Sequence, residues 1–396
     1  MSDGNPQTPQ TDPADPPVIG DNPPHAPAAP RHGRRRGIRW GRVVVIAAAL
    51  IFAVVASAVA YFGIRVNNAL NDIEQDPSAL PTGSRPPSAT PSVKTTYTAM
   101  NILLIGSDTR KGERGLSDTF IVVHISADRK SVYLVSFPRD MYVQIPGYGK
   151  EKINAAYSYG GSSKSIETIE NLTGARIDHV VVTNFENFVG LVNKVGPVTV
   201  DNPVASDPIR ADSRGVKYAQ FGKTGPVTLT DGNMALAFVR ERENLDRGDL
   251  DRTLRQRAFL KALALKLVTP EVLANPVKLL DIISMASQFI TTRDSGLSSD
   301  VIYSLMASMT GITTGEQIHL VQCPVGNFAT IPGIGDVELV DTAATQALGK
   351  ALQNDTMPAF VAAHPTTEYG YQPSAPPSSS KVLATTPSAT PTKKKS

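Results

Sequence analysis

Asn101–Asp140 reads "NILLIGSDTRKGERGLSDTFIVVHISADRKSVYLVSFPRD", and this stretch indicates the fold class. It contains three compact runs, at 101–108, 119–127 and 131–140, that are rich in β-branched and aromatic residues, a composition typical of strands. The last two runs flank the turn signal "DRK", which predicts a hairpin between them, and the first closes on a Gly-Ser-Asp loop. We therefore expect three neighbouring β-strands.

The pattern then alternates between strands and helices. Helical spacing of apolar residues, each time ended by a glycine, predicts helices within 163–174 and 184–196. Further strand candidates lie at 179–185, 197–201 and 316–325, and further helix candidates lie within 229–242, 249–268, 270–290 and 299–309. Strands that alternate with helices in one unit predict an α/β or α+β sheet covered by helices.

Residues 43–64 carry no charge and read "VVVIAAALIFAVVASAVAYFGI". At about 1.5 Å per residue this run is long enough to cross ~30 Å of hydrocarbon as a helix. A cleaved signal peptide would have a shorter apolar core nearer the amino terminus, and a buried core helix would show a polar stripe. The basic residues lie before the run, so we expect a single-pass transmembrane signal anchor of type II orientation, with 1–42 cytoplasmic.

Composition divides the rest of the chain. Residues 1–42 predict a disordered basic tail, 65–98 a Pro/Ser/Thr-rich linker, 99–363 an extracytoplasmic globular domain, and 364–396 a disordered tail. The flanks hold 13 of the 39 Lys and Arg residues and 8 of the 36 Asp and Glu residues, which leaves 26 against 28 in the globular part. A mildly acidic domain outside the cell argues against a nucleic-acid partner.

Cysteine and histidine usage narrows the chemistry further. Cys323 is the single cysteine, so the chain has no intrachain disulfide and no cysteine-based metal site. The six histidines are scattered, without the paired spacing of metal ligands, which argues against a zinc enzyme.

Three polar clusters could support chemistry. The first contains Asp108, Arg110 and Asp118, and the second contains Arg139, Asp140 and Lys152. Two carboxylates in one loop can supply the hard oxygen ligands that Mg²⁺ takes from proteins, and arginine binds phosphate through two parallel hydrogen bonds. Taken singly, a strand-end salt bridge is the better explanation of Arg139 and Asp140, and turn capping is the default explanation of Asp108 and Asp118.

The third cluster, "VRERENLDRGDLDRTLRQRAFL", occupies Val239–Leu260. If a helix begins at Asp249, then Asp249, Arg252 and Gln256 lie within about 60° of one another on one face. Arg255 and Arg257 then point elsewhere, and we expect them to be solvated or paired with acidic residues. Surface salt bridges are the alternative explanation of this spacing.

The residues before that helix add two more cations. If 239–243 is extended, Arg240 and Arg242 share one side, with Glu241 turned away. Four donors and one carboxylate then converge on one point. The apolar helices that follow could line a hydrophobic groove or form an ordinary core, and the sequence pattern fits both.

The order and spacing of "NILLIGSDTR", "SDTFIVVHI", "VYLVSFPRDMYV", "KINAAYSYGG", "DHVVVTNFENFVGLVNKVGPVTVD" and "GDLDRTLRQRAFLKAL" resemble the LytR–CpsA–Psr family of cell-envelope proteins. The resemblance implies an α/β/α fold, with a central mixed β-sheet covered by helices and a hydrophobic groove for a polyprenyl chain. It also implies an Mg²⁺-dependent phosphotransferase that moves a glycopolymer from a polyprenyl-diphosphate carrier to peptidoglycan and releases polyprenyl phosphate. The Ala- and Pro-rich flanks fit an actinobacterial source, where the cargo would be arabinogalactan.

The same resemblance assigns roles to residues. It implies that Asp108 and Asp118 hold the metal, and that Asp249, Arg252 and Arg139 are catalytic. The residues implied to bind the diphosphate are Arg110, Arg139, Lys152, Arg240, Arg242, Arg252 and Gln256. Asp249 either accepts the hydroxyl proton or orients Arg252, and both roles stay open.

Two rival functions use the same residues. A polyprenyl-diphosphate hydrolase would employ water in place of the glycan, and a non-catalytic envelope protein would only bind the lipid phosphate. A transcriptional regulator would need a cytoplasmic helix-turn-helix, and residues 1–42 contain no such pattern.

Overall fold

The computed structural model describes residues 64, 74–76, 78–89, 97–107, 115–206, 214–242, 244–273, 275–288, 290, 292–294, 296–309, 312 and 314–365, all within one compact unit. Of the residues singled out in the sequence, Asp108 and Arg110 lie outside this described part, as does the expected anchor at 43–64 apart from Ile64. No helix among the described residues is both long enough and apolar enough to cross a bilayer.

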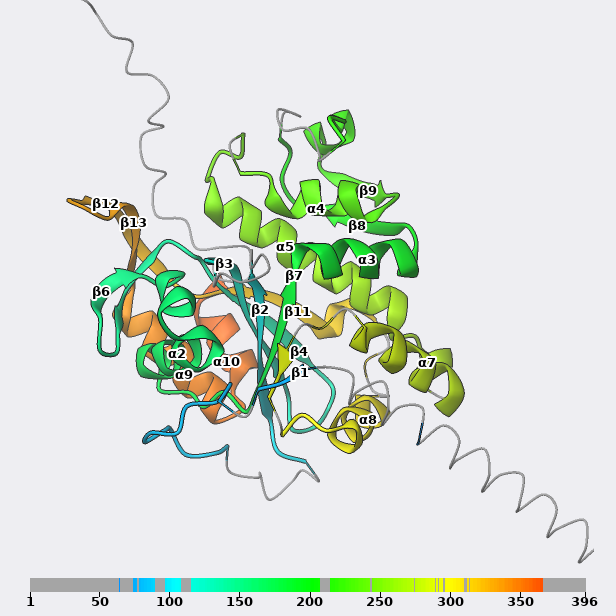
Figure 1. Ribbon diagram of the computed structural model, residues 1–396, viewed down its shortest axis with the longest axis horizontal. Coiled ribbons are helices and arrows are strands. Elements are labelled where there is room, and N and C mark those ends of the chain that lie inside the picture. The colour runs from blue at the N-terminus through cyan, green and yellow to red at the C-terminus, as the bar shows by residue number, and fades with distance from the viewer. Residues whose placement is uncertain are drawn as a thin grey trace, which may run out of the picture. The chain divides into compact units, whose positions relative to one another are not determined.

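A seven-stranded mixed sheet organises the described residues (Figure 1). Its strands, in spatial order, are β1 (Glu74–Gln75), β10 (Thr292–Arg293), β7 (His179–Asn184), β2 (Met100–Ser107), β3 (Ser117–Ile125), β4 (Val132–Phe137) and β11 (Ile318–Gln322). Strands β2, β3 and β4 are antiparallel neighbours, whereas β7 runs parallel to β2 and β11 runs parallel to β4. The three strands expected from 101–140 therefore form the centre of the sheet.

Helices cover both faces of this sheet, in agreement with the expected α/β layering (Figure 1). One face packs against α2 (Ala155–Thr173), α9 (Thr342–Gln353) and α10 (Met357–Ala363). The other side carries α3 (Phe185–Val195), α4 (Gly232–Arg240), α5 (Asp249–Leu267), α6 (Pro270–Leu273), α7 (Pro276–Ser287) and α8 (Ser299–Ser308). Strand alternation explains the two-sided core, because Leu103 and Ile105 join the α2 layer whereas Ile102 and Leu104 join the α5 layer.

Two smaller sheets were not expected as separate units. One contains β12 (Val325–Ile331), β13 (Gly335–Val340), β5 (Met141–Ile145) and β6 (Gly149–Lys152), and the other pairs β8 (Val198–Asn202) with β9 (Gly225–Leu229). Short 3₁₀ turns lie at Ala219–Gly222 and Gly315–Gln317. Strand β5 follows β4 after only the turn 138–140, so Arg139 and Asp140 lie at the junction of two sheets.

Residues 78–89, which we name the strap, belong to the stretch expected to be a linker, and they pack onto the folded unit. Arg85 donates hydrogen bonds from Nε and Nη2 to the Glu170 carboxylate at 3.0 and 2.6 Å, and from Nη2 to the carbonyl of Ile177. Glu170 in turn accepts a hydrogen bond from the backbone N–H of Ile177 at 2.8 Å. Both side chains of the Arg85–Glu170 pair are almost completely buried.

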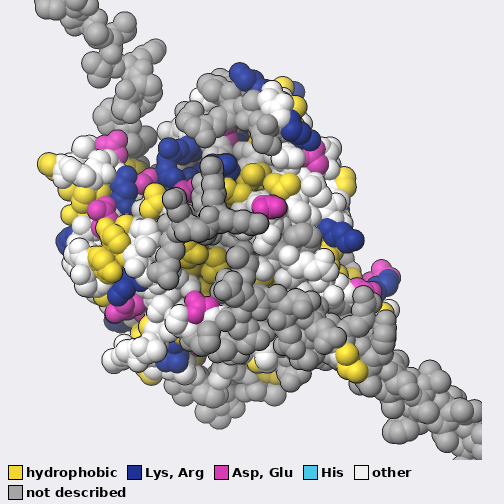
Figure 2. Space-filling view, in the orientation of Figure 1, with side chains coloured by type: hydrophobic (Ala, Val, Ile, Leu, Met, Phe, Trp, Pro, Cys, Tyr) yellow, Lys and Arg dark blue, Asp and Glu magenta, His cyan; other side chains and the backbone are white. Residues whose placement is uncertain are grey.

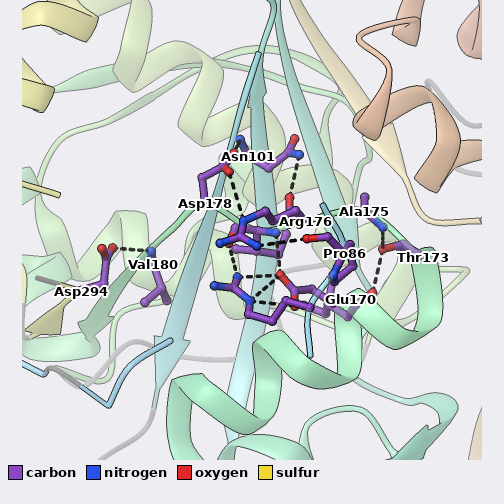
Figure 3. Close-up of polar contacts among 12 residues, drawn as sticks. Pro86, Asn101, Glu170, Thr173, Ala175, Arg176, Asp178, Val180 and Asp294 are labelled. Atoms are coloured by element: carbon purple, nitrogen blue, oxygen red, sulfur yellow. Dashed lines mark hydrogen bonds and ion pairs between the residues drawn. The ribbon is translucent and has the colours of Figure 1, made fainter. Parts of the chain in front are cut away.

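Two further hydrogen bonds hold the strap directly after Arg85. Arg176 donates to the carbonyl of Pro86 at 3.0 Å (Figure 3). Gln353 donates to the carbonyl of Pro87 at 2.7 Å. Ala79 is buried in the core beneath α2. The folded unit therefore includes residues on the amino-terminal side of residue 99.

We predict that Arg85→Ala destabilises the protein by about 3 kcal/mol, because it leaves the Glu170 carboxylate buried without its cation. Chemical denaturation followed by circular dichroism measures the change. Lys278→Ala is the matched control, since it breaks an exposed ion pair with Glu271 and should leave the midpoint unchanged. Equal midpoints for Arg85→Ala and the parent protein would contradict a structural role for the strap.

Candidate functional site

A cavity of about 220 Å³ lies on the α5 side of the sheet, between β2, β3 and β7 and helices α3, α4 and α5. Its apolar lining comes from Leu104, Ile121, Val181, Phe185, Phe188, Leu236, Val239, Phe259 and Leu260. Its charged and amide side chains come from Asp118, Arg139, Asn184, Arg240, Arg242, Arg252 and Gln256. One cavity thus combines an apolar wall with four arginines.

Strand register brings Asp118 and Arg139 together. Strands β3 and β4 are antiparallel with Phe120 opposite Phe137, so the same register places position 118 opposite position 139. The Arg139 Nη1 atom donates a hydrogen bond to Asp118 Oδ1 at 2.5 Å. Residues from the two hairpin strands therefore meet at the open end of the hairpin, where the chain enters the second sheet.

Helix α5 supplies the partner group. It begins at Asp249, as expected, after Gly248, whose φ of 51° is in the left-handed region that favours glycine. Arg252 Nη2 lies 2.6 Å from Asp249 Oδ1 and donates to the backbone carbonyl of Asp118 at 3.1 Å, while Arg139 Nε lies 3.5 Å from Asp249 Oδ1. Two arginines and two carboxylates thus form one connected ion-pair cluster at the positive end of a helix dipole.

Gln256 lies one turn further along the same face of α5. It is buried, its Nε2 donates to the carbonyl of Val239 at 3.2 Å, and its Oε1 has no hydrogen-bond partner. The expected common face of Asp249, Arg252 and Gln256 is confirmed, because Arg252 and Gln256 line the cavity and Asp249 is paired with Arg252.

Arg240 and Arg242 approach from α4. The expected extended run over 239–243 is wrong at its start, because the apolar spacing of α4 continues the helix to Arg240. Both arginines are nevertheless exposed and line the cavity, and the Arg240 guanidinium lies 4.4 Å from the centre of the Phe185 ring. Glu241 is buried and does not line the cavity, so it is turned away as expected.

Lys152 reaches the cluster indirectly. Its Nζ lies 3.0 Å from Asp140 Oδ1, and Asp140 Oδ2 lies 3.4 Å from Arg139 Nε. Lys152 does not line the cavity itself. Figure 2 shows Lys and Arg side chains, with Asp and Glu side chains beside them, gathered between the β12–β13 arm and helix α4.

The expectation that Arg255 and Arg257 are solvated or paired with acidic residues is wrong. Both are fully buried: Arg255 donates to the carbonyl of Val204 at 2.7 Å, and Arg257 donates to Ser136 Oγ and to the carbonyl of Val321 at 2.5 and 2.6 Å. The first three turns of α5 are packed on every side, so no face was left for solvent. Burial lowers the pKa of Arg257 to about 9, which still leaves it charged at neutral pH.

Glu338 is a candidate site residue that sequence reasoning missed. Strand β13 runs parallel to β5 with Glu338 opposite Met141, and the Glu338 N–H donates to the carbonyl of Asp140 at 2.9 Å. The side chain is buried, and its Oε2 has no hydrogen-bond partner. Burial raises the pKa of Glu338 well above its ordinary value, and the charges of Asp249 and Asp140 add to the effect.

Asp249 is a second buried acid with a raised pKa and with oxygens that lack a hydrogen-bond partner. Burial raises its pKa above the ordinary value, although the neighbouring Arg252 lowers it. Neither carboxylate oxygen of Asp249 accepts a hydrogen bond of regular geometry. A buried acid with unsatisfied oxygens beside two arginines is a group positioned for a proton, a cation or a substrate hydroxyl.

The fit of these residues to a divalent cation is partial. Within the described ranges, no group of three or more His, Cys, Asp or Glu side chains is arranged to hold a metal ion. However, Asp118 and Asp249 both lie against Arg139, the Asp249 oxygens accept no hydrogen bond of regular geometry, and hard carboxylate oxygens suit Mg²⁺. The donor chemistry therefore fits Mg²⁺, while the expected partner Asp108 lies outside the described residues.

We predict that Glu338→Gln raises the melting temperature by a few degrees at pH 7.5 but not at pH 4. A carboxyl whose folded-state pKa is raised holds its proton in the folded protein after the unfolded chain has lost it, so stability falls as pH rises above about 4.5. Glutamine cannot ionise and avoids this loss. Scanning calorimetry at the two pH values checks the prediction, and identical melting curves at pH 7.5 would refute the inferred shift.

Comparison with known sequences identifies relatives. A model of the LytR_cpsA_psr family matches residues 61–351. The probable cell wall biosynthesis protein LcpB of Corynebacterium glutamicum is 32% identical over 287 residues, which cover 67% of this chain and 64% of LcpB. The polyisoprenyl-teichoic acid–peptidoglycan teichoic acid transferase TagV of Bacillus subtilis is 33% identical over 269 residues, which cover 65% of this chain and 67% of TagV. The match thus spans about two thirds of each relative.

Solved structures share the fold. The crystal structure of Bacillus subtilis TagV superimposes with a TM-score of 0.56 and 30% identity, covering 65% of this chain and 97% of that one. A structure of TagT with bound octaprenyl pyrophosphate lipid superimposes with a TM-score of 0.50 and 26% identity, covering 70% of this chain and 98% of that one.

Proposed function

Because this chain belongs to the LytR_cpsA_psr family, we propose that it transfers a cell-envelope glycopolymer from a polyprenyl-diphosphate carrier to peptidoglycan. The name of TagV describes such a transfer for teichoic acid, and a structure of TagT contains a bound octaprenyl pyrophosphate lipid. The product is a phosphodiester between glycopolymer and peptidoglycan, and polyprenyl phosphate is the leaving group.

The observation that carries the proposal is the combination of surfaces in one cavity. An isoprenoid diphosphate has a long apolar chain joined to a compact multiply charged headgroup. The apolar lining from Phe185 to Leu260 suits the chain, and Arg139, Arg240, Arg242 and Arg252 suit the headgroup. A soluble nucleotide or sugar phosphate would not need the apolar lining of the cavity.

The cluster residues have distinct tasks in this reaction. The hydroxyl oxygen of the acceptor forms a bond to the sugar-side phosphorus, and the bond from that phosphorus to the bridging oxygen breaks. Arg139 and Arg252 stabilise the charge that grows on the departing phosphate, and the amino-terminal end of α5 acts in the same direction. Arg240, Arg242, Gln256 and Lys152 (the last through Asp140) bind or position the diphosphate, and Arg110 joins them as predicted from the sequence.

Asp249 has two compatible roles in the proposal. Its ion pair with Arg252, at 2.6 Å, orients the guanidinium. Its raised pKa brings it closer to the working pH of a general base, so it is also suited to accept the proton of the attacking hydroxyl.

Mg²⁺ is part of the proposal, with Asp118 and Asp108 as its protein ligands and Asp249 beside them. When bound, the ion would neutralise charge on the diphosphate. The residues named above bind and orient the substrate in its presence.

The proposal also specifies which glycopolymer is transferred and where the catalytic domain lies. We propose arabinogalactan as the glycopolymer, which the corynebacterial relative LcpB and the Ala- and Pro-rich flanks support. We also propose that 43–64 anchors the chain in the cell membrane with the catalytic domain outside, because the donor is itself a membrane lipid.

One experiment separates the proposal from its rivals. The purified full chain is incubated with a polyprenyl-diphosphate-linked glycan, with and without peptidoglycan fragments, and the products are followed by mass spectrometry. Transfer requires the acceptor for release of polyprenyl phosphate. Release at the same rate without acceptor would identify a hydrolase, and binding without any release would identify a lipid-binding protein.

We predict that Arg252→Ala lowers kcat/KM for transfer by about 10²–10³-fold, because it removes a preorganised donor from the phosphate that leaves. Arg214→Ala is the matched control, since Arg214 forms an exposed ion pair with Asp231 and does not line the cavity. Transfer rates measured under limiting donor check the prediction. A loss below threefold would remove Arg252 from the catalytic cluster.

We predict that chelation of divalent ions abolishes transfer, and that Asp118→Asn raises the Mg²⁺ concentration needed for half-maximal rate. The amide supplies a weaker ligand than the carboxylate. Asp128→Asn, in an exposed hairpin turn, should leave the Mg²⁺ requirement unchanged. Full activity in excess EDTA would exclude the metal from the reaction.

A further inference from the structure

Two exposed tyrosines stack on each other at the turn of the hairpin that carries Lys152. Tyr148 lies in the turn of the β5–β6 hairpin and is 54% exposed, and Tyr159 lies in the first turns of α2 and is 39% exposed. Their ring centroids are 4.2 Å apart and the ring planes differ by 3°. An ordered pair of large flat rings left in solvent is typical of a binding surface.

Glycines with positive φ angles lie close to each tyrosine in the sequence. Tyr148 is flanked by Gly147 and Gly149, whose φ values of 83° and 90° exclude other residues without strain. Directly after Tyr159, α2 is kinked at Gly160–Gly161, and Gly161 adopts φ 65° and ψ −150°, a region that is essentially restricted to glycine. The two rings therefore meet through local backbone geometry, and not through burial.

Lys164 lies near the pair, in the first turn of α2 beyond the kink. Its Nζ lies 5.8 Å from the centre of the Tyr148 ring and 2.6 Å from a carboxylate oxygen of Glu167. A Cβ atom at position 160 would lie 2.7 Å from Lys164 Cβ, so a larger residue there would disturb this arrangement.

The same hairpin joins the tyrosines to the reaction centre. Its inner end carries Lys152, which pairs with Asp140, which in turn lies beside Arg139. Lys152 lies four positions after Tyr148, about 13 Å along a strand. Asp140 and Lys152 do not line the apolar cavity, and Figure 1 places β6 and α2 across the central strands from α3 and α4, which do. Figure 2 shows exposed hydrophobic side chains near β6.

The direction of the reaction assigns the side of the β5–β6 hairpin to the acceptor. In phosphoryl transfer the attacking and leaving oxygens lie roughly in line on opposite sides of the phosphorus. The leaving group is the polyprenyl phosphate, whose chain occupies the apolar cavity. An attacking hydroxyl in line with this leaving group approaches from outside the cavity, and Asp140 and Lys152 lie outside it, on the hairpin that carries Tyr148.

We propose that Tyr148 and Tyr159 form a carbohydrate subsite that binds a pyranose ring of the acceptor glycan strand, a proposal that rests on the proposed function. The C–H bonds on one face of a pyranose carry partial positive charge, and they stack on the negative face of an aromatic ring. One sugar bound here would hold the neighbouring sugars of the strand along the hairpin, toward Arg139.

The test measures acceptor and donor separately. Tyr148→Leu, Tyr159→Leu and the double variant keep apolar volume but remove the aromatic face, whereas Tyr148→Phe keeps it. We expect the double variant to raise KM for soluble peptidoglycan glycan fragments about tenfold, with kcat and donor KM changed less than twofold, and Tyr148→Phe to behave like the parent. Tyr97→Leu, another exposed tyrosine away from the hairpin, is the matched control.

Two other kinetic results would overturn the proposal. An unchanged acceptor KM in folded Leu variants would leave the pair as a packing feature, and a raised donor KM would assign the subsite to the donor glycan. Direct titration of the glycan fragments into full-length protein in nanodiscs, read by NMR, makes the test independent of turnover. Binding that is lost in the Leu variants supports the subsite even if no transfer occurs, and absence of binding in the parent refutes it.

Discussion

Helix α5 buries the charged side chains of its first three turns, and other segments of the structure supply polar partners for each of them. Five charged residues, Asp249, Asp251, Arg252, Arg255 and Arg257, lie within its first three turns. A buried charge without a partner costs several kcal/mol, so each must find one. Arg257 donates hydrogen bonds to Ser136 and Val321 in the sheet. Arg255 donates to Val204 in the loop after β8, and Asp251 forms an ion pair with Arg247. The helix that anchors the α5 layer to the sheet is therefore the helix that presents Asp249 and Arg252 to the cavity.

Prior pairing of the arginines affects what the site can bind. Arg139 is already shared between Asp118, Asp140 and Asp249, and Arg252 is held by Asp249. These guanidiniums are oriented before a ligand arrives, which lowers the reorganisation needed at the moment of reaction. An anion must compete with existing carboxylates for them, so a weakly charged ligand gains little, whereas a diphosphate offers enough charge to displace or bridge the pairs. The exposed Arg240 and Arg242 at the end of α4 are better placed for first contact.

Local patterns predicted the parts of this site that depend on one segment. The three central strands, the start of α5 at Asp249 and the common face of Asp249, Arg252 and Gln256 follow from periodicity and were confirmed. The features that escaped prediction depend on pairing between distant segments. Glu338 lies at the site only because β13 pairs with β5, about two hundred residues earlier, and no local pattern encodes that register. Arg255 and Arg257 were misjudged because an arginine on a helix is normally exposed, and only the tertiary packing around α5 reverses that preference.

The packing of the strap onto the folded unit limits the distance between the proposed membrane anchor and the cavity. Strand β1 pairs with β10 at Glu74 and Gln75, and the strap is fastened by Arg85, so the chain is held by the domain from residue 74 onward. With the proposed anchor ending at Ile64, only residues 65–73 remain as a tether, and nine residues extend to about 30 Å at most. If 43–64 is the anchor, a tether of this length keeps the cavity within reach of lipid headgroups in the same bilayer. It then also limits how far from the membrane surface the protein can act on an acceptor glycan.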